Sequence, residues 1–128
     1  RTPDEVARYV VDAENRGCQV FIGAAGLAAH LAGAVAARTT RPVIGIPCDG
    51  GPLNGVDALY STVQMPGGIP VATVAVGKAG AKNAAYLAAQ IMALSDPELD
   101  LRVKEDRRKA SEAVMVKDAA LQEKLAKL

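Results

Sequence analysis

The chain has 128 residues and half of them are apolar, which is typical of one folded domain with a substantial core. Fifteen basic and fourteen acidic residues leave a formal net charge of +1, so no overall field attracts nucleic acid or a membrane surface. Aromatic residues make up 3% and Trp is absent, which argues against a platform for stacked bases. No apolar run approaches the roughly 20 residues that span a bilayer, and no signal peptide is visible. We therefore expect a cytoplasmic protein without nucleic-acid or membrane partners, in which Cys18 and Cys48 are buried free thiols rather than a disulfide.

The first predicted element is a helix that begins at once. Thr2 and Glu5 have the spacing of a capping box, Pro3 suits the first helical position, and Gly17 ends the helix. Its buried face is predicted to comprise Val6, Tyr9, Val10 and Ala13.

Strands and helices then alternate along the chain. The predicted order is a strand at 18–22 covered on both faces, a small-residue turn from Gly23, a helix at 28–37, a strand at 42–47, a helix at 55–64, a strand at 71–76, a helix at 79–94 and a last helix capped by Asp96 that runs towards Leu128. This alternation predicts an α/β fold with a mainly parallel sheet and right-handed crossovers. Ligands bind such sheets beyond the carboxyl ends of the strands, so the loops at 23–29, 48–54 and 77–82 are the expected functional sites.

Two features favour a domain that is incomplete on its own. Only three strands are evident, and a helix cap at the very start of the sequence predicts that a segment is missing at the front. The segment 99–128 is long and highly charged, with apolar residues spaced for a helix stripe, and such a helix needs a surface such as a neighbouring subunit. We therefore divide the chain into an α/β domain at 1–95, incomplete at its N-terminus, and a helical extension at 96–128.

The only histidine, His30, lies in the small-residue turn that follows the first strand. Backbone N–H groups at 25–28 could face a phosphate or carboxylate there, beside an imidazole able to move protons at neutral pH. From spacing alone, however, a lone histidine is more often a packed or exposed residue than a catalyst. For four other loop residues, both a ligand contact and a solvated surface position fit the sequence: Asp49, Asn54, Lys78 and Lys82. The basic run at 104–109 is interleaved with acids, which favours a solvated helix face.

Several segments in order resemble one family. They are Arg1-Thr2-Pro3, Ala28-Ala29-His30-Leu31, Pro42-Val43-Ile44-Gly45-Ile46-Pro47, Leu53-Asn54-Gly55-Val56-Asp57-Ala58-Leu59-Tyr60-Ser61, Val63-Gln64-Met65-Pro66, Gly68-Ile69-Pro70-Val71-Ala72-Thr73, and Gly77-Lys78-Ala79-Gly80-Ala81-Lys82-Asn83-Ala84-Ala85. Over residues 1 to about 95 the chain resembles the bacterial class I 5-(carboxyamino)imidazole ribonucleotide mutases, isomerases of purine biosynthesis. The resemblance implies a three-layer, flavodoxin-like domain that forms an octamer, with the last helix packed on a neighbour.

The resemblance also implies a reaction. The carboxylate on the exocyclic nitrogen of an imidazole ribonucleotide moves to ring carbon 4, through carbon dioxide that is released and trapped in the site. A histidine handles the protons, and no metal, nucleotide or organic cofactor is expected. The main proton-carrying histidine of the family would stand immediately before Arg1, which leaves His30 as the second active-site histidine.

The site residues that the resemblance implies are Arg1, which would hold the substrate phosphate, and His30 with the loop around it. The substrate-binding loop residues are Gly23, Ala24, Ala25, Gly26 and Leu31. Ala24 and Leu27 stand where glycines are common in the family, and the Cβ of Ala24 crowds the approach of substrate. Two alternatives stay open at this point: a direct carboxylase of aminoimidazole ribonucleotide, and a non-catalytic, oligomerising, nucleotide-binding α/β module.

Overall fold

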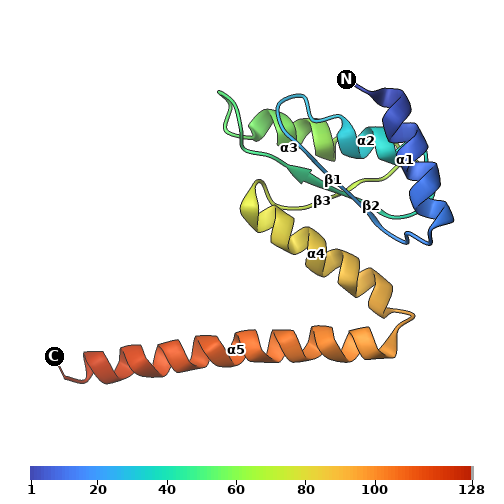
Figure 1. Ribbon diagram of the computed structural model, residues 1–128. Helices are drawn as coiled ribbons and strands as arrows, with labels where there is room; N and C mark the ends of the chain where they lie inside the picture. The colour runs from blue at the N-terminus through green and yellow to red at the C-terminus, as the bar shows by residue number, and fades with distance from the viewer. Residues whose placement is uncertain (128) are drawn as a thin grey trace. The chain divides into compact units, whose positions relative to one another are not determined.

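A computed structural model describes residues 1–127 of the chain (Figure 1). The elements run in the order α1 (Pro3–Asn15), β1 (Phe21–Ala25), α2 (Leu31–Ala36), β2 (Val43–Pro47), α3 (Val56–Val63), β3 (Ala72–Thr73), α4 (Lys78–Ala93) and α5 (Pro97–Leu125). The chain forms two compact units, residues 1–91 and a second unit that begins at Met92.

The described sheet has three parallel strands in the order β1-β2-β3. Phe21 of β1 pairs with Val43 of β2, and the register continues to Ala25 opposite Pro47. β2 and β3 pair over two residues only, at Ile44 and Gly45 of β2. The α/β class and the parallel sheet predicted from the alternating elements are therefore confirmed.

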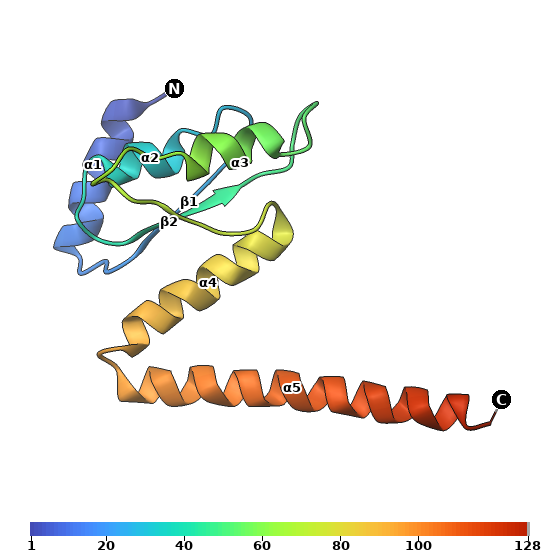
Figure 2. The same cartoon turned by 180° about the vertical axis from the view of Figure 1, so that it is seen from behind.

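Helices cover both faces of the sheet in the first unit, as Figures 1 and 2 show. Since side chains alternate along a strand, Val43 of β2 joins Val10 of α1 and Val35 of α2 in one cluster, while Ile44 and Ile46 face Ala84 of α4 in another. Every residue of β2 is buried. The three-layer order of helices, sheet and helix is the predicted one.

β1 differs from the prediction in position and in cover. The N–H of Phe21 donates to the carbonyl of Pro42 over 2.9 Å, so pairing begins at Phe21 rather than Cys18 and extends through Gly23, Ala24 and Ala25. The predicted turn at these residues was therefore wrong, because pairing with β2 draws the small residues into the strand. The prediction that both faces of this strand are covered was also wrong. Ile22 remains 47% exposed, since β1 is the edge of the described sheet and α4 packs over β2.

Three smaller predictions need correction. Thr2 precedes α1 as predicted, but its side chain makes no capping hydrogen bond; its backbone carbonyl accepts from the N–H of Val6 instead. Tyr9 is 64% exposed rather than on the buried face. The third strand has two residues in place of six, although the N–H of Val74 still donates to the carbonyl of Gly45.

The second unit contains α5, whose start follows the predicted rule. The carboxylate of Asp96 accepts a hydrogen bond from the N–H of Leu99 over 3.0 Å, which caps the helix. Taken by itself, α5 has no buried residue among those described, and its basic side chains pair with acids one turn away, as predicted for 104–109. The paired Arg108 guanidinium lowers the pKa of the exposed Glu105 carboxyl to about 2. No helix in the described range is long and apolar enough to cross a membrane.

Candidate active site

The loops that follow the three strands meet at the carboxyl end of the sheet. The N–H of Cys48, just after β2, donates to the carbonyl of Ala25 at the end of β1 over 2.9 Å. The N–H of Gly77, before α4, donates to the carbonyl of Pro47 over 2.8 Å. These two bonds hold the three connections side by side, at the edge where ligands of parallel sheets bind.

Close backbone contacts pack these loops together. Gly77 has a φ of +73°, and a Cβ on it would lie 2.9 Å from a carboxylate oxygen of Asp49. Gly55 has a φ of +87°, and a Cβ there would lie 2.6 Å from Val76. Both positions need glycine for the backbone angle and for space, so the loop at 48–55 rests against the connection at 74–77.

The first of these loops is built from residues without bulk. A Cβ on Gly23 would lie 3.0 Å from the Cα of Ala32, so the glycine lets α2 approach β1 closely. Gly26 lies beside Cys48: a Cβ on Gly26 would lie 3.4 Å from the Cβ of Cys48. α2 begins at Leu31, three residues later than predicted, and leaves residues 26–30 as an irregular connection at the sheet edge.

His30 precedes α2 at the N-cap position, and its imidazole is exposed. The side chain makes no capping hydrogen bond; the backbone carbonyl accepts from the N–H of Ala34 over 2.8 Å. The neighbouring Ala29 is buried, which anchors the backbone beneath the histidine. The imidazole is thus presented outward on an anchored loop, where it can meet a ligand.

The beginning of α1 borders an apolar hollow beside β1. Glu5 and Val6 of its first turns line this hollow of about 300 Å³ together with Gly23 of β1 and Leu31 of α2, and Tyr9, Phe21, Ile22 and Val35 complete the lining. Arg1 stands two residues before α1 and is exposed. The hollow therefore runs along β1 and reaches Gly23 and Leu31 at one end.

The remaining candidates lie around this edge. Asp49 is exposed and rests against Gly77, and Asn54 adopts a φ of +51° in the loop after β2. The ammonium of Lys82 lies 5.8 Å from the ring centre of Tyr86 on α4, a cation–π contact. The structure adds Asp57, which the sequence did not single out: one carboxylate oxygen is buried and has no hydrogen-bond partner among the described residues. Only its position in the first turn of α3 could have drawn attention to it.

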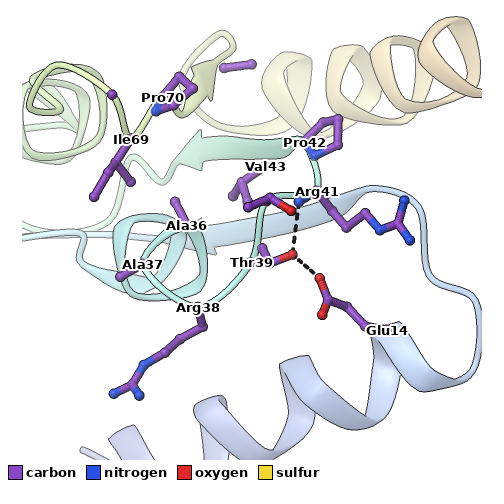
Figure 3. A pocket seen from close by; sticks show the side chains of 13 residues that line it. Glu14, Ala36, Ala37, Arg38, Thr39, Arg41, Pro42, Val43, Ile69 and Pro70 are labelled. Carbon is purple, nitrogen blue, oxygen red and sulfur yellow. Dashed lines mark hydrogen bonds between the residues drawn. The ribbon is translucent and has the colours of Figure 1, made fainter.

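Another hollow lies at the opposite end of the sheet. It has a volume of about 810 Å³ and is lined by the C-terminal end of α2 and by Val43 and Ala72, which begin β2 and β3. Figure 3 shows its two arginines, Arg38 and Arg41, pointing to different sides, while Thr39 links Glu14 to the backbone N–H of Arg41. Charged groups do not converge there, so the carboxyl edge is the better candidate site.

Fold and site together define a parallel α/β domain with a small-residue loop and an exposed histidine beyond the strand ends. The sequence model of the AIR carboxylase family matches residues 1–113, and the chain belongs to this family.

Several curated relatives are about half identical to the chain. The N5-carboxyaminoimidazole ribonucleotide mutase of Escherichia coli K12 is 53% identical over 115 residues, which are 90% of this chain and 68% of the relative. The mutase of Thermotoga maritima is 49% identical over 123 residues, or 96% of this chain and 71% of the relative. A bifunctional purine synthesis protein purC/E of Dictyostelium discoideum is 50% identical over 114 residues, only 11% of its length. Sequences similar to this chain thus occur both in short mutases and inside a longer protein.

Proposed function

We propose that this chain is a mutase of purine biosynthesis, which moves the carboxylate of 5-(carboxyamino)imidazole ribonucleotide from the exocyclic nitrogen to ring carbon 4. The observation that carries the proposal is the exposed His30 on a small-residue loop at the carboxyl edge, in a chain half identical to proteins named as mutases. The names of these relatives favour the isomerase over a direct carboxylase and over a module without catalysis.

The ligand of the proposed site is a nucleotide with one phosphate. Arg1 holds the phosphate, because a guanidinium offers a planar fork of donors that matches phosphate oxygens. Gly23, Ala24, Ala25 and Gly26 form the small-residue loop that meets the ring and ribose, with the closest approach at Gly26, and Leu31 supplies an apolar contact. The hollow that Gly23 and Leu31 share supports the placement of these two residues in the site.

The proposed reaction conserves every atom of the substrate. The bond from the exocyclic nitrogen to the carboxyl carbon breaks, carbon dioxide forms, and the nitrogen takes up a proton. Ring carbon 4 then attacks the carbon dioxide and loses its own proton, so one proton is taken up and one is released. An imidazole suits such transfers because it can gain or lose a proton near neutral pH. His30 assists in this proton transfer.

We propose that the protein works as a homo-octamer in the cytoplasm. The 29-residue α5, which by itself buries none of its described residues, packs on a neighbouring subunit. Cys18 and Cys48 are free and partly buried, less buried than the sequence predicted, and free thiols suit a reducing compartment. Mass measurement of the purified oligomer tests the proposed number of subunits.

The activity is tested with the purified protein and three reaction mixtures. The mutase converts carboxyaminoimidazole ribonucleotide to its carbon-linked isomer without ATP, whereas a direct carboxylase prefers aminoimidazole ribonucleotide with carbon dioxide, and a binding module turns over neither. His30→Asn should lower kcat by about 10²-fold or more, the usual contribution of an acid or base group. Arg38→Gln, at the opposite end of the sheet, is the matched control and should keep its turnover. Unchanged turnover in His30→Asn would remove His30 from the mechanism.

A further inference from the structure

Leu27 has a backbone conformation that its side chain disfavours. Its φ is +55°, and among residues 1–127 the only other non-glycine residue with a positive φ is Asn54. Asparagine tolerates the left-handed region because its short polar side chain can bond locally, but leucine gains no such compensation. A bulky residue in this region therefore calls for a reason elsewhere in the structure.

Burial in the core does not supply that reason. The side chain of Leu27 is 54% exposed and belongs to neither apolar cluster of the domain. Its tip lies close to Gly51 of the next loop: a Cβ on Gly51 would lie 2.5 Å from Cδ2 of Leu27. The tip of the leucine thus occupies the place that any other residue at 51 would need for its own side chain.

This contact completes the support of the loop at 48–55. On one side the loop rests on the connection to α4, through Asp49 against Gly77 and Gly55 against Val76. On the other side, Leu27 and the Gly26–Cys48 contact join it to the loop that carries His30. Because Leu27 is also apolar and half exposed, it presents a water-repelling surface where the two loops meet.

We propose that Leu27 is a positioning residue that locks the loop at 48–55 onto the His30 loop and keeps water out of the site between them. The inference rests on the proposed mutase function and deepens it. If the loops stay joined, carbon dioxide released from the exocyclic nitrogen remains beside ring carbon 4. If they part, carbon dioxide escapes and is hydrated to bicarbonate, and the protonated product, aminoimidazole ribonucleotide, leaves without its carboxylate.

The first test compares Leu27→Gly with Leu94→Gly in the whole protein. Leu94 is the control, since it is an exposed leucine, 89% exposed, that lies outside the loops of the candidate site. In Leu27→Gly, kcat/KM for the mutase reaction should fall by about tenfold or more, as expected when a reacting group loses its position. The fraction of substrate released as aminoimidazole ribonucleotide should rise in this variant alone. Wild-type values of both quantities in Leu27→Gly would overturn the proposal.

The second test does not depend on activity. Gly51→Ala is introduced into the wild-type chain and into Leu27→Gly, and the folding equilibrium constant is measured by denaturant titration. The strain at Gly51, whose φ is +97°, is common to both backgrounds and cancels. The loss on Gly51→Ala should be larger by about twofold or more with Leu27 present, the lower range of coupling for residues in contact, because the tip of a leucine side chain can shift. Equal losses would refute the Leu27–Gly51 lock, whereas an inactive wild-type protein with coupled losses would refute only the mutase function.

Discussion

Gly45 on the central strand offers a sharp test of how the sheet holds α3, the helix that follows the candidate-site loop. A Cβ on Gly45 would lie 2.4 Å from Cγ2 of Thr62 and 2.8 Å from Cγ1 of Val71, whereas carbon atoms in good contact are about 3.5 to 4.0 Å apart. Gly45→Ala therefore forces two neighbours outward by about 1 Å. Overpacking of this kind costs about 1 to 3 kcal/mol, and the loss of glycine's freedom in a strand returns about 0.5 to 1 kcal/mol.

We expect Gly45→Ala to lower the free energy of unfolding by about 0.5 to 2 kcal/mol. In a denaturant titration the midpoint should fall while the slope stays constant, because the surface exposed on unfolding hardly changes. Gly67→Ala is the matched control: nothing lies within 4 Å of the added Cβ, and its φ is not positive, so the midpoint should move little.

A second substitution checks the cause of this loss. Thr62→Ser removes the methyl group that Gly45→Ala strikes, and it keeps the hydroxyl that donates to the carbonyl of Ala58 over 2.7 Å. Alone it should cost about 1 kcal/mol, for one lost buried methyl group. Together the two substitutions should cost about 1 kcal/mol less than their sum, because the clash with Thr62 is relieved, while those with Val71 and Ala32 remain. Strict additivity would show that the close approach of Gly45 to Thr62 is not what makes glycine necessary.

Two further predictions concern α4 and α5. Gly80→Ala should destabilise the chain by about 2 kcal/mol or more, since the added Cβ would lie 1.7 Å from the carbonyl oxygen of Ala75, a backbone atom that cannot rotate away. A denaturation midpoint as little changed as in Gly67→Ala would contradict this packing. In α5, the Glu105 carboxyl should titrate near pH 2 by carbon-13 NMR, and Arg108→Gln should return its pKa towards the ordinary value of about 4.3. Because the folded pKa is lowered, the Glu105–Arg108 pair supports the helix fully above the ordinary pKa and is lost as the pH falls towards 2; an unchanged titration in Arg108→Gln would refute the pairing.

Sequence patterns placed most elements correctly where local signals were strong. Proline at the start of a helix located α1 and α5, the capping carboxylate of Asp96 was correct, and the apolar run ended by Pro47 located β2. The order of helix and strand then defined the parallel sheet and the edge that carries the candidate site. His30 was singled out because it is the only histidine and lies in a small-residue loop.

The hydrogen-bond register of β1 and the burial of its side chains and of Tyr9 depended on elements distant in the sequence. The apolar run from Cys18 predicted a strand there, but hydrogen bonding to β2 begins at Phe21 and draws in Gly23 and Ala25, which have little strand propensity of their own. Tyr9 and Ile22 fit the apolar pattern of buried residues, and both are exposed because no described element lies over them. Local composition predicts neither where β1 begins nor which of its apolar residues are exposed, since both depend on the elements that pair with it and pack on it.

For this protein, the sequence by itself determined the α/β class, the order of the elements and the loop with its histidine, because proline, glycine and apolar periodicity act over a few residues. Only the tertiary structure decided that Leu27 meets Gly51, that Asp49 lies against Gly77, and that one oxygen of Asp57 is buried without a described partner. These contacts join loops that lie 20 or more residues apart in the chain, and their energies depend on close packing that no local pattern specifies.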